Sequence, residues 1–580
     1  MKRLALVCVA SVLFAACSSH GGTPLVPGAM PAGAGDLTAS LHLPTGVPAA
    51  SLGQVEFNVA LPLRNQAELD RFLAAVSDPD SPSYREFMTR EQFLERYGPS
   101  QADLAAVAQE LRRAGFRVSI MDQAVAAGGT RAQAERYFAT HLTAGAGGEF
   151  VRTSALRLSP ALSSRGAMVV GFEPMAFRVD SERVALPATG RLPHNRTSPV
   201  GPYFTSDMKE AYQFPSYQVA TGKGVTIGII ISSPVKTSDV TAYFKDQLLK
   251  VSPKVVNVAV DGGGKYSAGS DGTFEATLDA EQSLGMAPGA EAKVFNFPSL
   301  SNGNQIYDAY TKAVDASVAV VNSSFGLCES SNPLSAYTAF DDVFKQGLAA
   351  GTTFVAASGD HADANCGSNA EGNPDKKGVS WPASSSYVLA VGGTNLKTQF
   401  VKSSNESGYV SEEAYEDNLG EGSHWGSGGG YSGAGYYARP SWQAGFVSGT
   451  KRGVPDIALH MGGCPEGAVQ PCNKDDSADI EVLAGKESGA VGTSASSPDA
   501  VGLIALATQL SGKPFGDIHS LLYQAAKVSG LLHRGIKGNN GYPTTSGLWD
   551  PVLGIGTPDA AFKIAGASAA AGVPGTPSNP

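Results

Sequence analysis

Charged side chains are scarce in this sequence of 580 residues. Asp, Glu, Lys and Arg together make up 17% of it, against about 25% in ordinary soluble proteins. The formal net charge is −10 and no block of Lys or Arg occurs, so the composition argues against nucleic acid as a partner. Few charges and 69 glycines suit a loop-rich exported protein, including one that has to survive acid. The length predicts two or three domains.

An apolar run long enough to cross a bilayer is lacking at the N-terminus. The run "LALVCVASVLFAA" follows Lys2 and Arg3, is too short to span a membrane and has the layout of a signal peptide. It ends in "LFAACSS", which resembles a bacterial lipobox with Cys17 as the lipid-bearing residue. Phe14 stands where Leu is commoner, so ordinary cleavage after Ala16 is the alternative. We predict a signal peptide at residues 1–17, export to the cell envelope or medium, and a membrane tether if Cys17 is lipidated.

Cysteines are few, and none has a zinc-finger spacing. Of the 6 in the chain, Cys8 and Cys17 belong to the signal region. The four that remain are an even number in an exported protein, which predicts two structural disulfides rather than a metal site. Cys464–Cys472 would close a small loop, and Cys328–Cys366 would tie together two strand-end loops.

Composition and hydrophobic periodicity divide the chain into successive parts. Residues 18–36 are rich in Gly, Ser, Pro and Ala and read as a flexible tether. Residues 37–185 alternate strand and helix patterns and predict a small α+β domain. Residues 186–202 look like an exposed linker in which processing is expected. Residues 203–563 contain short apolar strands between helical segments, which predict an α/β domain with a mainly parallel sheet, and residues 564–580 are expected to be a disordered tail.

The stretch "VGTSASSPD" indicates a nucleophilic serine, Ser494, at the start of an apolar helix. Backbone N–H groups at a helix start can stabilise a developing oxyanion. An ordinary helix cap is the alternative explanation of the same residues. A serine hydroxyl reacts only when a base takes its proton, so the base has to be found elsewhere.

A histidine base is lacking where a subtilisin would carry one. The corresponding segment reads "DGTFEATLDAEQSLGMAPGA" and contains Glu275 and Asp279 instead. On a helix, these two side chains project from one face, one turn apart. One carboxyl of such a pair has a raised pKa and the two can share a proton, so Glu275 could act as the base and Asp279 could hold it. A solvent-exposed helix shows the same spacing by chance.

A third acid, Asp360, follows the apolar strand in "TTFVAASGDHADANCG". A protonated carboxyl at a strand end could donate a hydrogen bond to an oxyanion. A turn-forming Asp after Gly is the alternative. His361 could favour the ionised form of Asp360 through its positive charge, or could be an exposed loop residue.

Taken in order, these residues resemble the sedolisins, or serine-carboxyl peptidases. That family carries an E-x-x-x-D pair, an S-G-D aspartate and a G-T-S-A-S-x-P serine, which here are Glu275 with Asp279, Asp360, and Ser494. The blocks "SWPASSSYVLAVGGT", "HWGSGGGYSGAGYYARPSWQ" and "GLWDPVLGIGTP" extend the resemblance, which covers about residues 37–563. It implies a subtilisin-like fold preceded by a removable activation domain. It also implies Glu275 as general base, Asp279 as its partner, Ser494 as nucleophile and Asp360 as the oxyanion-hole acid.

One departure from the family concerns calcium. Members usually bind this ion through an aspartate that is replaced here by Arg534 in "LHRGIKGNNG", whereas the second aspartate is retained as Asp550. A guanidinium cannot coordinate a cation. No cofactor is therefore favoured, and we expect Arg534 to pair with Asp550 in place of the metal; a weakened calcium site held by carbonyls and water is the alternative.

The sequence thus predicts an exported, acid-active serine endopeptidase that processes itself from a proenzyme. Its expected partners are protein or peptide substrates and its own first domain as an inhibitor. An inactive, peptidase-shaped binding protein is the alternative from another class, against which the intact set of site residues argues.

Overall fold

The computed structural model describes residues 53–145, 148–184, 186, 201–367, 375–415, 417–418, 424–463 and 477–559. The predicted signal peptide with Cys17, the tether, most of the linker at 186–202, the Cys464–Cys472 loop and the tail at 564–580 lie outside these residues. Among the helices that the structure describes, none is both long and apolar enough to cross a bilayer.

Four antiparallel strands form the sheet of the first domain, residues 53–172. Their order is β2 (Arg117–Ile120), β3 (Ala124–Thr130), β1 (Gln54–Ala60) and β6 (Met168–Val170). In the inner strand β1, Phe57 packs edge-on against Phe116 and Phe138 in the core.

The first domain also contains the four helices α1 (Gln66–Ser77), α2 (Arg90–Arg96), α3 (Gln101–Arg113) and α4 (Arg131–Phe138), besides the short elements β4 (Leu142–Ala144), β5 (Phe150–Arg152) and α5 (Pro160–Ser163). Two of them begin at a capping box: Thr89 with Gln92 for α2, and Thr130 with Gln133 for α4. Such reciprocal hydrogen bonds satisfy the free N–H groups of a first helical turn. The α+β organisation predicted for this domain is confirmed.

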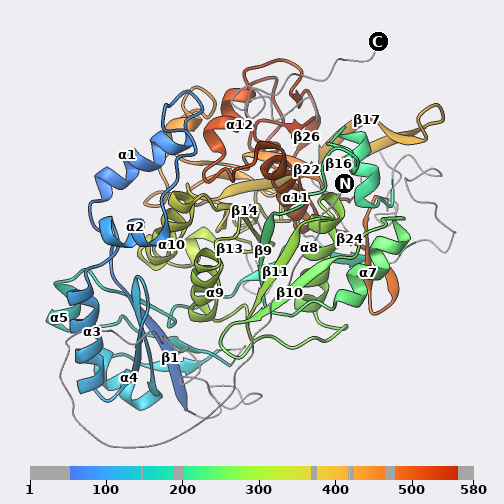
Figure 1. Ribbon diagram of the computed structural model, residues 1–580. Helices are drawn as coiled ribbons and strands as arrows, with labels where there is room; N and C mark the ends of the chain where they lie inside the picture. Colours follow the sequence, from blue (N-terminus) through green and yellow to red (C-terminus); the bar gives the residue numbers. More distant parts are fainter. Residues whose placement is uncertain are drawn as a thin grey trace, which may run out of the picture. The chain divides into compact units, whose positions relative to one another are not determined.

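A nine-stranded sheet is the centre of the second domain, residues 201–559 (Figure 1). Its strands β9 (Thr226–Ile231), β10 (Lys254–Ala259), β11 (Glu291–Asn296), β12 (Val320–Ser323), β14 (Thr353–Ala357) and β16 (Leu389–Val401) are parallel and lie in the order β10-β11-β9-β12-β14-β16. Strand β22 (Ile457–His460) is parallel to β16, β17 (Glu406–Tyr415) is antiparallel to it, and β26 (Lys537–Asn539) is parallel to β17. The predicted mainly parallel α/β domain is confirmed.

Two buried helices, α8 (Asp271–Met286) and α11 (Thr493–Ser511), pack against each other in the second domain. Almost every residue of both is buried, so neither has a polar face turned to solvent. A Cβ at Gly502 of α11 would lie 2.4 Å from the Met286 Cβ of α8. Glycine at this position therefore lets the two helices approach closely.

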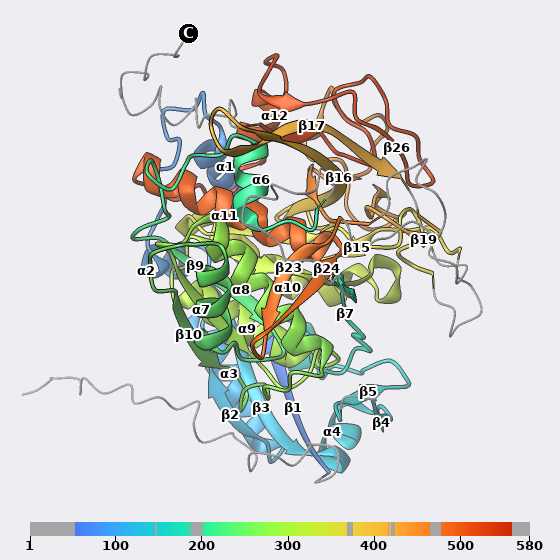
Figure 2. The ribbon, with the colours of Figure 1, turned by 90° about the vertical axis from the view of Figure 1, so that its right-hand side faces the viewer.

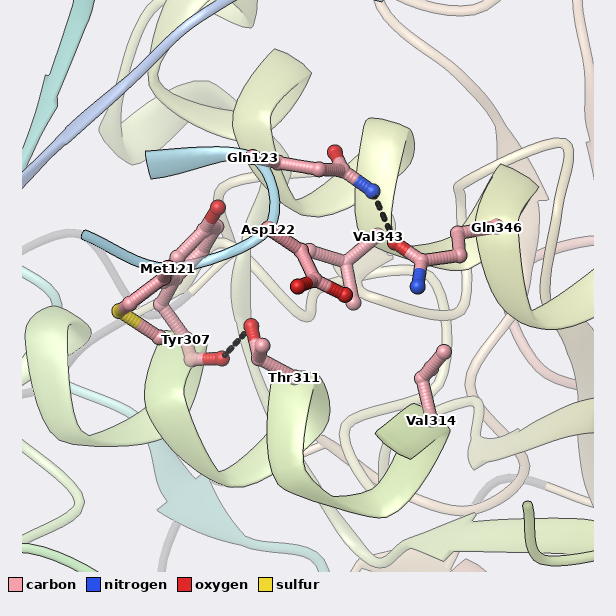
Figure 3. A pocket seen from close by; sticks show the side chains of 8 residues that line it. All are labelled: Met121, Asp122, Gln123, Tyr307, Thr311, Val314, Val343 and Gln346. Carbon is pink, nitrogen blue, oxygen red and sulfur yellow. Dashed lines mark hydrogen bonds between the residues drawn. The ribbon is translucent and has the colours of Figure 1, made fainter. Parts of the chain in front are cut away.

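The two domains meet along helices α9 (Gly303–Asp315) and α10 (Leu334–Ala350) of the second domain. Arg90 of the first domain forms ion pairs with Asp122 of the same domain at 2.5 Å and with Asp315 of α9 in the second domain at 3.0 Å. The Gln123 amide donates a hydrogen bond to Gln346 of α10, and the loop that carries it lines a small pocket with side chains from α9 and α10 (Figure 3). Polar contacts and packed helices thus hold the domains together.

The segment that leaves the first domain, residues 173–184, adds strands to the second (Figure 2). Strand β7 (Arg178–Val179) pairs antiparallel with β13 (Phe325–Cys328), which in turn pairs with β15 (Ser380–Trp381). Strand β8 (Glu182–Val184) pairs antiparallel with β24 (Lys486–Val491), the partner of β23 (Asp479–Leu483). The segment is therefore extended on both sides of residues 180 and 181.

Candidate active site

Ser494 lies in the first turn of α11, immediately after the end of strand β24. The turn between them is made by Gly492, whose φ of 132° is a conformation that other residues rarely adopt. A Cβ on Gly492 would also lie 2.4 Å from the Asp360 Oδ2 atom. The glycine of "VGTS" thus provides both the sharp turn and the space beside the serine.

Glu275 and Asp279 lie one turn apart on α8 and are fully buried. Asp279 Oδ1 accepts a hydrogen bond of 2.6 Å from Ser324 Oγ, which itself accepts one of 2.9 Å from Asn322 Nδ2. Ser497 Oγ of α11 donates to Asn322 Oδ1 at 2.7 Å. This chain of hydrogen bonds fixes the Asp279 carboxyl from the end of β12.

Burial controls the charge of the carboxyl pair. It raises the pKa of Glu275 well above its usual range, with the charge of Asp279 adding to the rise, while hydrogen bonds from Ser181 and Ser494 oppose it. Burial likewise raises the pKa of Asp279 to about 8. Glu275 Oε1 and Asp279 Oδ2 are both buried without a hydrogen-bond partner, so the pair has the property of two acids that share a proton.

Asp360 follows β14 at the carboxyl edge of the sheet, beside the start of α11. Its Oδ1 accepts hydrogen bonds from the Thr493 backbone N–H at 2.7 Å and the Thr493 hydroxyl at 2.8 Å, whereas its buried Oδ2 accepts none. Burial, followed by the charge of Asp180, raises the pKa of Asp360 well above its usual range. The acid is therefore protonated in mild acid, and its Oδ2 can donate a hydrogen bond.

His361 is not the exposed residue that one alternative expected. It is partly buried, with Nδ1 3.2 Å from the His424 carbonyl oxygen. Burial, followed by the charge of Arg178, lowers the pKa of His361 to about 4. Its ring is neutral above that pH and so does not favour the ionised form of Asp360.

A backbone donor and an unpaired carboxyl oxygen lie beside Ser494. The Ser494 backbone N–H donates to the carbonyl oxygen of Asp180 at 2.9 Å. That carbonyl oxygen and Asp360 Oδ2 each lie 2.4 Å from the position that a Cβ on Gly492 would take, so both are on the same side of Gly492. A backbone N–H at hydrogen-bond distance from a carbonyl oxygen is the kind of donor that stabilises an oxyanion. The Ser494 hydroxyl itself lies 3.2 Å from the Ser324 carbonyl oxygen and contacts Glu275.

The structure thus brings together Glu275, Asp279, Asp360 and Ser494, which the sequence analysis singled out. It adds supporting side chains that the sequence analysis missed: Asn322 and Ser324 in "VVNSSFG", Ser497, and Thr493. The only signal for the first two was the run of three polar residues, Asn-Ser-Ser, at the end of an apolar strand.

Of the predicted disulfides, the structure joins Cys328 at the end of β13 to Cys366, with 4.7 Å between their Cα atoms. The bond links the strand that pairs with β7 to the loop that follows Asp360. The Cys464–Cys472 pair lies outside the described residues.

The residues expected near a calcium ion do not fit one. Asp550 Oδ1 accepts backbone hydrogen bonds from Val552 and Leu553, and its Oδ2 accepts one from Thr545, each at 3.0 Å. Within the described part of the chain, no three His, Cys, Asp or Glu side chains cluster as metal ligands would. The predicted ion pair is also wrong: the Arg534 guanidinium donates to the Ala526 carbonyl oxygen after α12 (His519–Ala525), because Asp550 is occupied in capping its own turn.

Comparisons with known proteins identify relatives of both domains. A model of the "Pro-kumamolisin, activation domain" family matches residues 46–173, and one of the "Subtilase family" matches residues 263–545. Xanthomonalisin of Xanthomonas sp. (strain T-22) is 31% identical over 547 residues, which are 86% of this chain and 64% of that protein. Sedolisin of Pseudomonas sp. (strain 101) is 29% identical over 532 residues, 87% of this chain and 85% of that one.

Among solved structures, Pseudomonas sedolisin complexed with two molecules of pseudo-iodotyrostatin superimposes with a TM-score of 0.54 and 29% identity. The match covers 65% of this chain and 98% of that one. The chain spans 64% of the length of xanthomonalisin, so that protein extends beyond the matched part. Fold, site and likeness together show that the chain belongs to the sedolisin family of serine-carboxyl peptidases, with a pro-kumamolisin-type activation domain ahead of a subtilisin-like peptidase domain.

Proposed function

We propose that this protein is an acid-active serine endopeptidase made as a self-processing proenzyme. The observation that carries the proposal is the hydrogen bond from the Ser494 N–H to one peptide carbonyl, with the unpaired oxygen of Asp360 on the same side of Gly492 and the buried Glu275–Asp279 pair beside Ser494. An inactive binding protein would have no use for a carboxyl pair buried against a serine hydroxyl.

In the proposed reaction, Ser494 Oγ attacks the substrate carbonyl carbon while Glu275 accepts its proton. Asp279 keeps Glu275 in position, as the orienting acid does in a catalytic triad. Unlike that acid, it also shares a proton with its partner. The oxyanion receives hydrogen bonds from the Ser494 N–H and from protonated Asp360. Glu275 then gives its proton to the leaving amine, and water releases the acyl group in the reverse sequence.

The carboxyls set the pH range of this reaction. Asp360 donates only when protonated, and its raised pKa keeps it protonated through mild acid. The Glu275–Asp279 pair has to lose one proton before Glu275 can accept that of Ser494. We therefore expect a bell-shaped profile, with loss of the first proton of the pair as its acid limb and loss of the Asp360 proton as its alkaline limb.

The experiment that tests this function compares the unprocessed protein with Ser494→Ala and Glu275→Gln. All three are shifted to about pH 4, where carboxyls titrate, and chain length and casein cleavage are followed. We expect only the wild type to shorten and then to cut casein, with about 10⁴-fold or more separating it from Ser494→Ala. Equal behaviour of all three would favour the binding-protein alternative.

Export and lipidation form a separate part of the proposal, supported by the sequence of residues 1–17. We infer that the protein leaves the cytoplasm through this segment and is held at a membrane by a lipid on Cys17. Mass spectrometry of the N-terminal peptide from the membrane fraction tests this, because Cys17→Ser should move the protein to the soluble fraction. Equal partition of both forms would refute the tether but not the peptidase.

A further inference from the structure

The segment between the two domains occupies the active site as an extended peptide. Before residue 180, Val179 pairs with Phe325 of β13; after residue 181, Arg183 pairs with Ala490 of β24. The Asp180 N–H also donates to the Ser324 carbonyl oxygen at 3.3 Å. Addition of a strand to an exposed sheet edge is a general mode of peptide recognition, and here it fixes the register on both sides of one peptide bond.

That bond, between Asp180 and Ser181, is the one presented to the reactive groups. Its carbonyl oxygen accepts the 2.9 Å hydrogen bond from the Ser494 N–H, and this oxygen and Asp360 Oδ2 both lie 2.4 Å from the position of a Cβ on Gly492. On its other side, the Ser181 hydroxyl donates to Glu275 Oε2. The carbonyl thus faces the oxyanion donors, and the residue that carries the leaving amine contacts the base.

We propose that the first self-cleavage of the chain breaks the peptide bond between Asp180 and Ser181. A bond forms between Ser494 Oγ and the Asp180 carbonyl carbon as the bond to the Ser181 nitrogen breaks, and the serine proton passes through Glu275 to that nitrogen. Water then hydrolyses the ester, leaving a carboxylic acid at Asp180, and Ser494 regains its proton. The proposal rests on the peptidase function and adds to it the bond and its register.

The Asp180 side chain occupies the subsite on the amino-terminal side of the cleaved bond. Its surroundings indicate which side chains that subsite accepts. It is buried, and a Cβ on Gly326 would lie 3.3 Å from Asp180 Oδ2 and 3.0 Å from the Ser380 Cβ, so glycine at 326 leaves the room for it. Asp180 Oδ2 has no hydrogen-bond partner, and burial raises the pKa of Asp180 to about 7 against the opposing charge of Arg178. In mild acid the subsite therefore holds an uncharged carboxyl, and an amide of the same shape should replace it.

This bond lies upstream of the linker at 186–202, where the sequence alone placed processing. The linker is exposed by composition, but chemistry requires a bond held at the nucleophile rather than an accessible one. Cleavage at Asp180 leaves β8 at the new N-terminus, still paired with β24, so a further trim downstream is compatible with the first cut.

The test identifies the first new N-terminus. The purified full-length protein is shifted to about pH 4, quenched at the earliest detectable cleavage, and both fragments are measured by intact mass and N-terminal sequencing. We expect one fragment that begins at Ser181 and one that ends at Asp180. A first cut elsewhere, with casein activity gained, would overturn the proposal and leave the peptidase function standing; no cut and no casein activity in wild type would overturn both.

Two variants of Asp180 test the subsite. Asp180→Asn keeps the shape and should be cut at the same bond at a similar rate, whereas Asp180→Lys buries a cation and should be cut about tenfold or more slowly. Equal rates for the two would overturn the assignment of residue 180 to this subsite.

A synthetic peptide makes the test independent of proenzyme folding. The peptide AFRVDSERVALP, residues 176–187, is incubated with processed enzyme and should yield AFRVD and SERVALP. The same peptide with Lys in place of Asp180 should be cut about tenfold or more slowly, and that with Asn at a similar rate. Cleavage of the parent peptide only at another bond would overturn the proposal.

Discussion

At the scale of single residues, Asp360 has two oxygens with different surroundings. Oδ1 accepts two hydrogen bonds from Thr493, and Oδ2 accepts none beside the oxyanion position. Asp360→Asn keeps an acceptor for Thr493 and supplies an N–H donor that needs no protonation. We expect a kcat about tenfold lower at acid pH but an alkaline limb of kcat/KM moved to higher pH. The pH profile of processed enzyme on a fluorogenic peptide measures both, and an unmoved alkaline limb would contradict the role given to Asp360.

Ser324 acts on the reaction through Asp279, to which it donates a hydrogen bond of 2.6 Å. This bond favours the ionised form of Asp279 and lowers its pKa, so Ser324→Ala should raise the pKa of the carboxyl pair. The acid limb of kcat/KM should then move to higher pH, with a loss of about tenfold at its old midpoint. Ser323→Ala is the matched control, because that neighbouring hydroxyl contacts Tyr310 at 2.7 Å instead. Identical profiles for the two variants would rule out the positioning role.

The sequence could predict residues that carry their own local pattern. Ser494 stands in a strand-to-helix turn, Glu275 and Asp279 share one helix face, and Asp360 ends an apolar strand. Asn322 and Ser324 carry no comparable pattern, because their role arises only when β12 lies beside α8 and α11. The position of Asp180 in the site is equally hidden, since it depends on β7 and β8 pairing with strands far away along the chain.

At the scale of elements, strand β1 and helix α9 meet through a polar cluster. Asn58 of β1 donates to Asn304 Oδ1 and to Asp308 Oδ1, each at 2.8 Å. Burial, followed by the charge of Asp261, raises the pKa of Glu56 to about 7, while Arg117 opposes the rise. Burial also raises the pKa of Asp308 to about 6 and that of Asp261 well above its usual range. Three carboxyls with raised pKa values therefore lie where the two domains meet.

This cluster should hold the domains together more firmly in acid. A raised folded-state pKa gives stability that is complete below the ordinary value of about 4 and is lost as the pH rises through about 7 for Glu56. In the Ser494→Ala protein, Glu56→Gln should therefore raise the melting temperature by about 1–2 °C at pH 7 and leave it unchanged at pH 4. Glu95→Gln, at an exposed position of α2, is the control. Calorimetry at both pH values checks this, and a gain at pH 4 alone would contradict the assigned sign.

The loop around Arg534 should be independent of calcium. Asp550 already accepts three backbone hydrogen bonds, and Arg534 brings a positive charge to the position where the family usually has a ligand. Dialysis of processed enzyme against EDTA should therefore change the melting temperature by less than about 1 °C. Arg534→Ala should lower it by about 1–2 °C, because the Ala526 carbonyl loses its donor. A large loss of stability on chelation, restored by calcium, would show that the loop binds the ion after all.

At the scale of the whole molecule, buried carboxyls outside the active site are a recurring feature of the second domain. Glu281 of α8 faces Glu481 of β23, and Asp499 of α11 faces Asp479 of the same strand; burial raises the pKa of all four well above their usual ranges. Both oxygens of Asp479 and Asp499 are buried without hydrogen-bond partners. Such groups are tolerated as neutral acids and costly as anions, so the fold as a whole should be more stable in acid.

The Asp479–Asp499 pair offers the clearest test of this. His460 Nε2 lies 3.8 Å from Asp479, but burial lowers the pKa of His460 to about 4, so above that pH it does not neutralise the pair. The folded-state pKa values of both acids are raised, so their stabilising contribution is complete below about pH 4 and is lost as the pH rises. In the Ser494→Ala protein, Asp499→Asn should therefore reduce the fall in melting temperature between about pH 4 and pH 8 by about 2 °C or more. Asp80→Asn, at an exposed position, should leave that fall unchanged, and equal falls in all three proteins would mean that the pair does not set the acid preference of the fold.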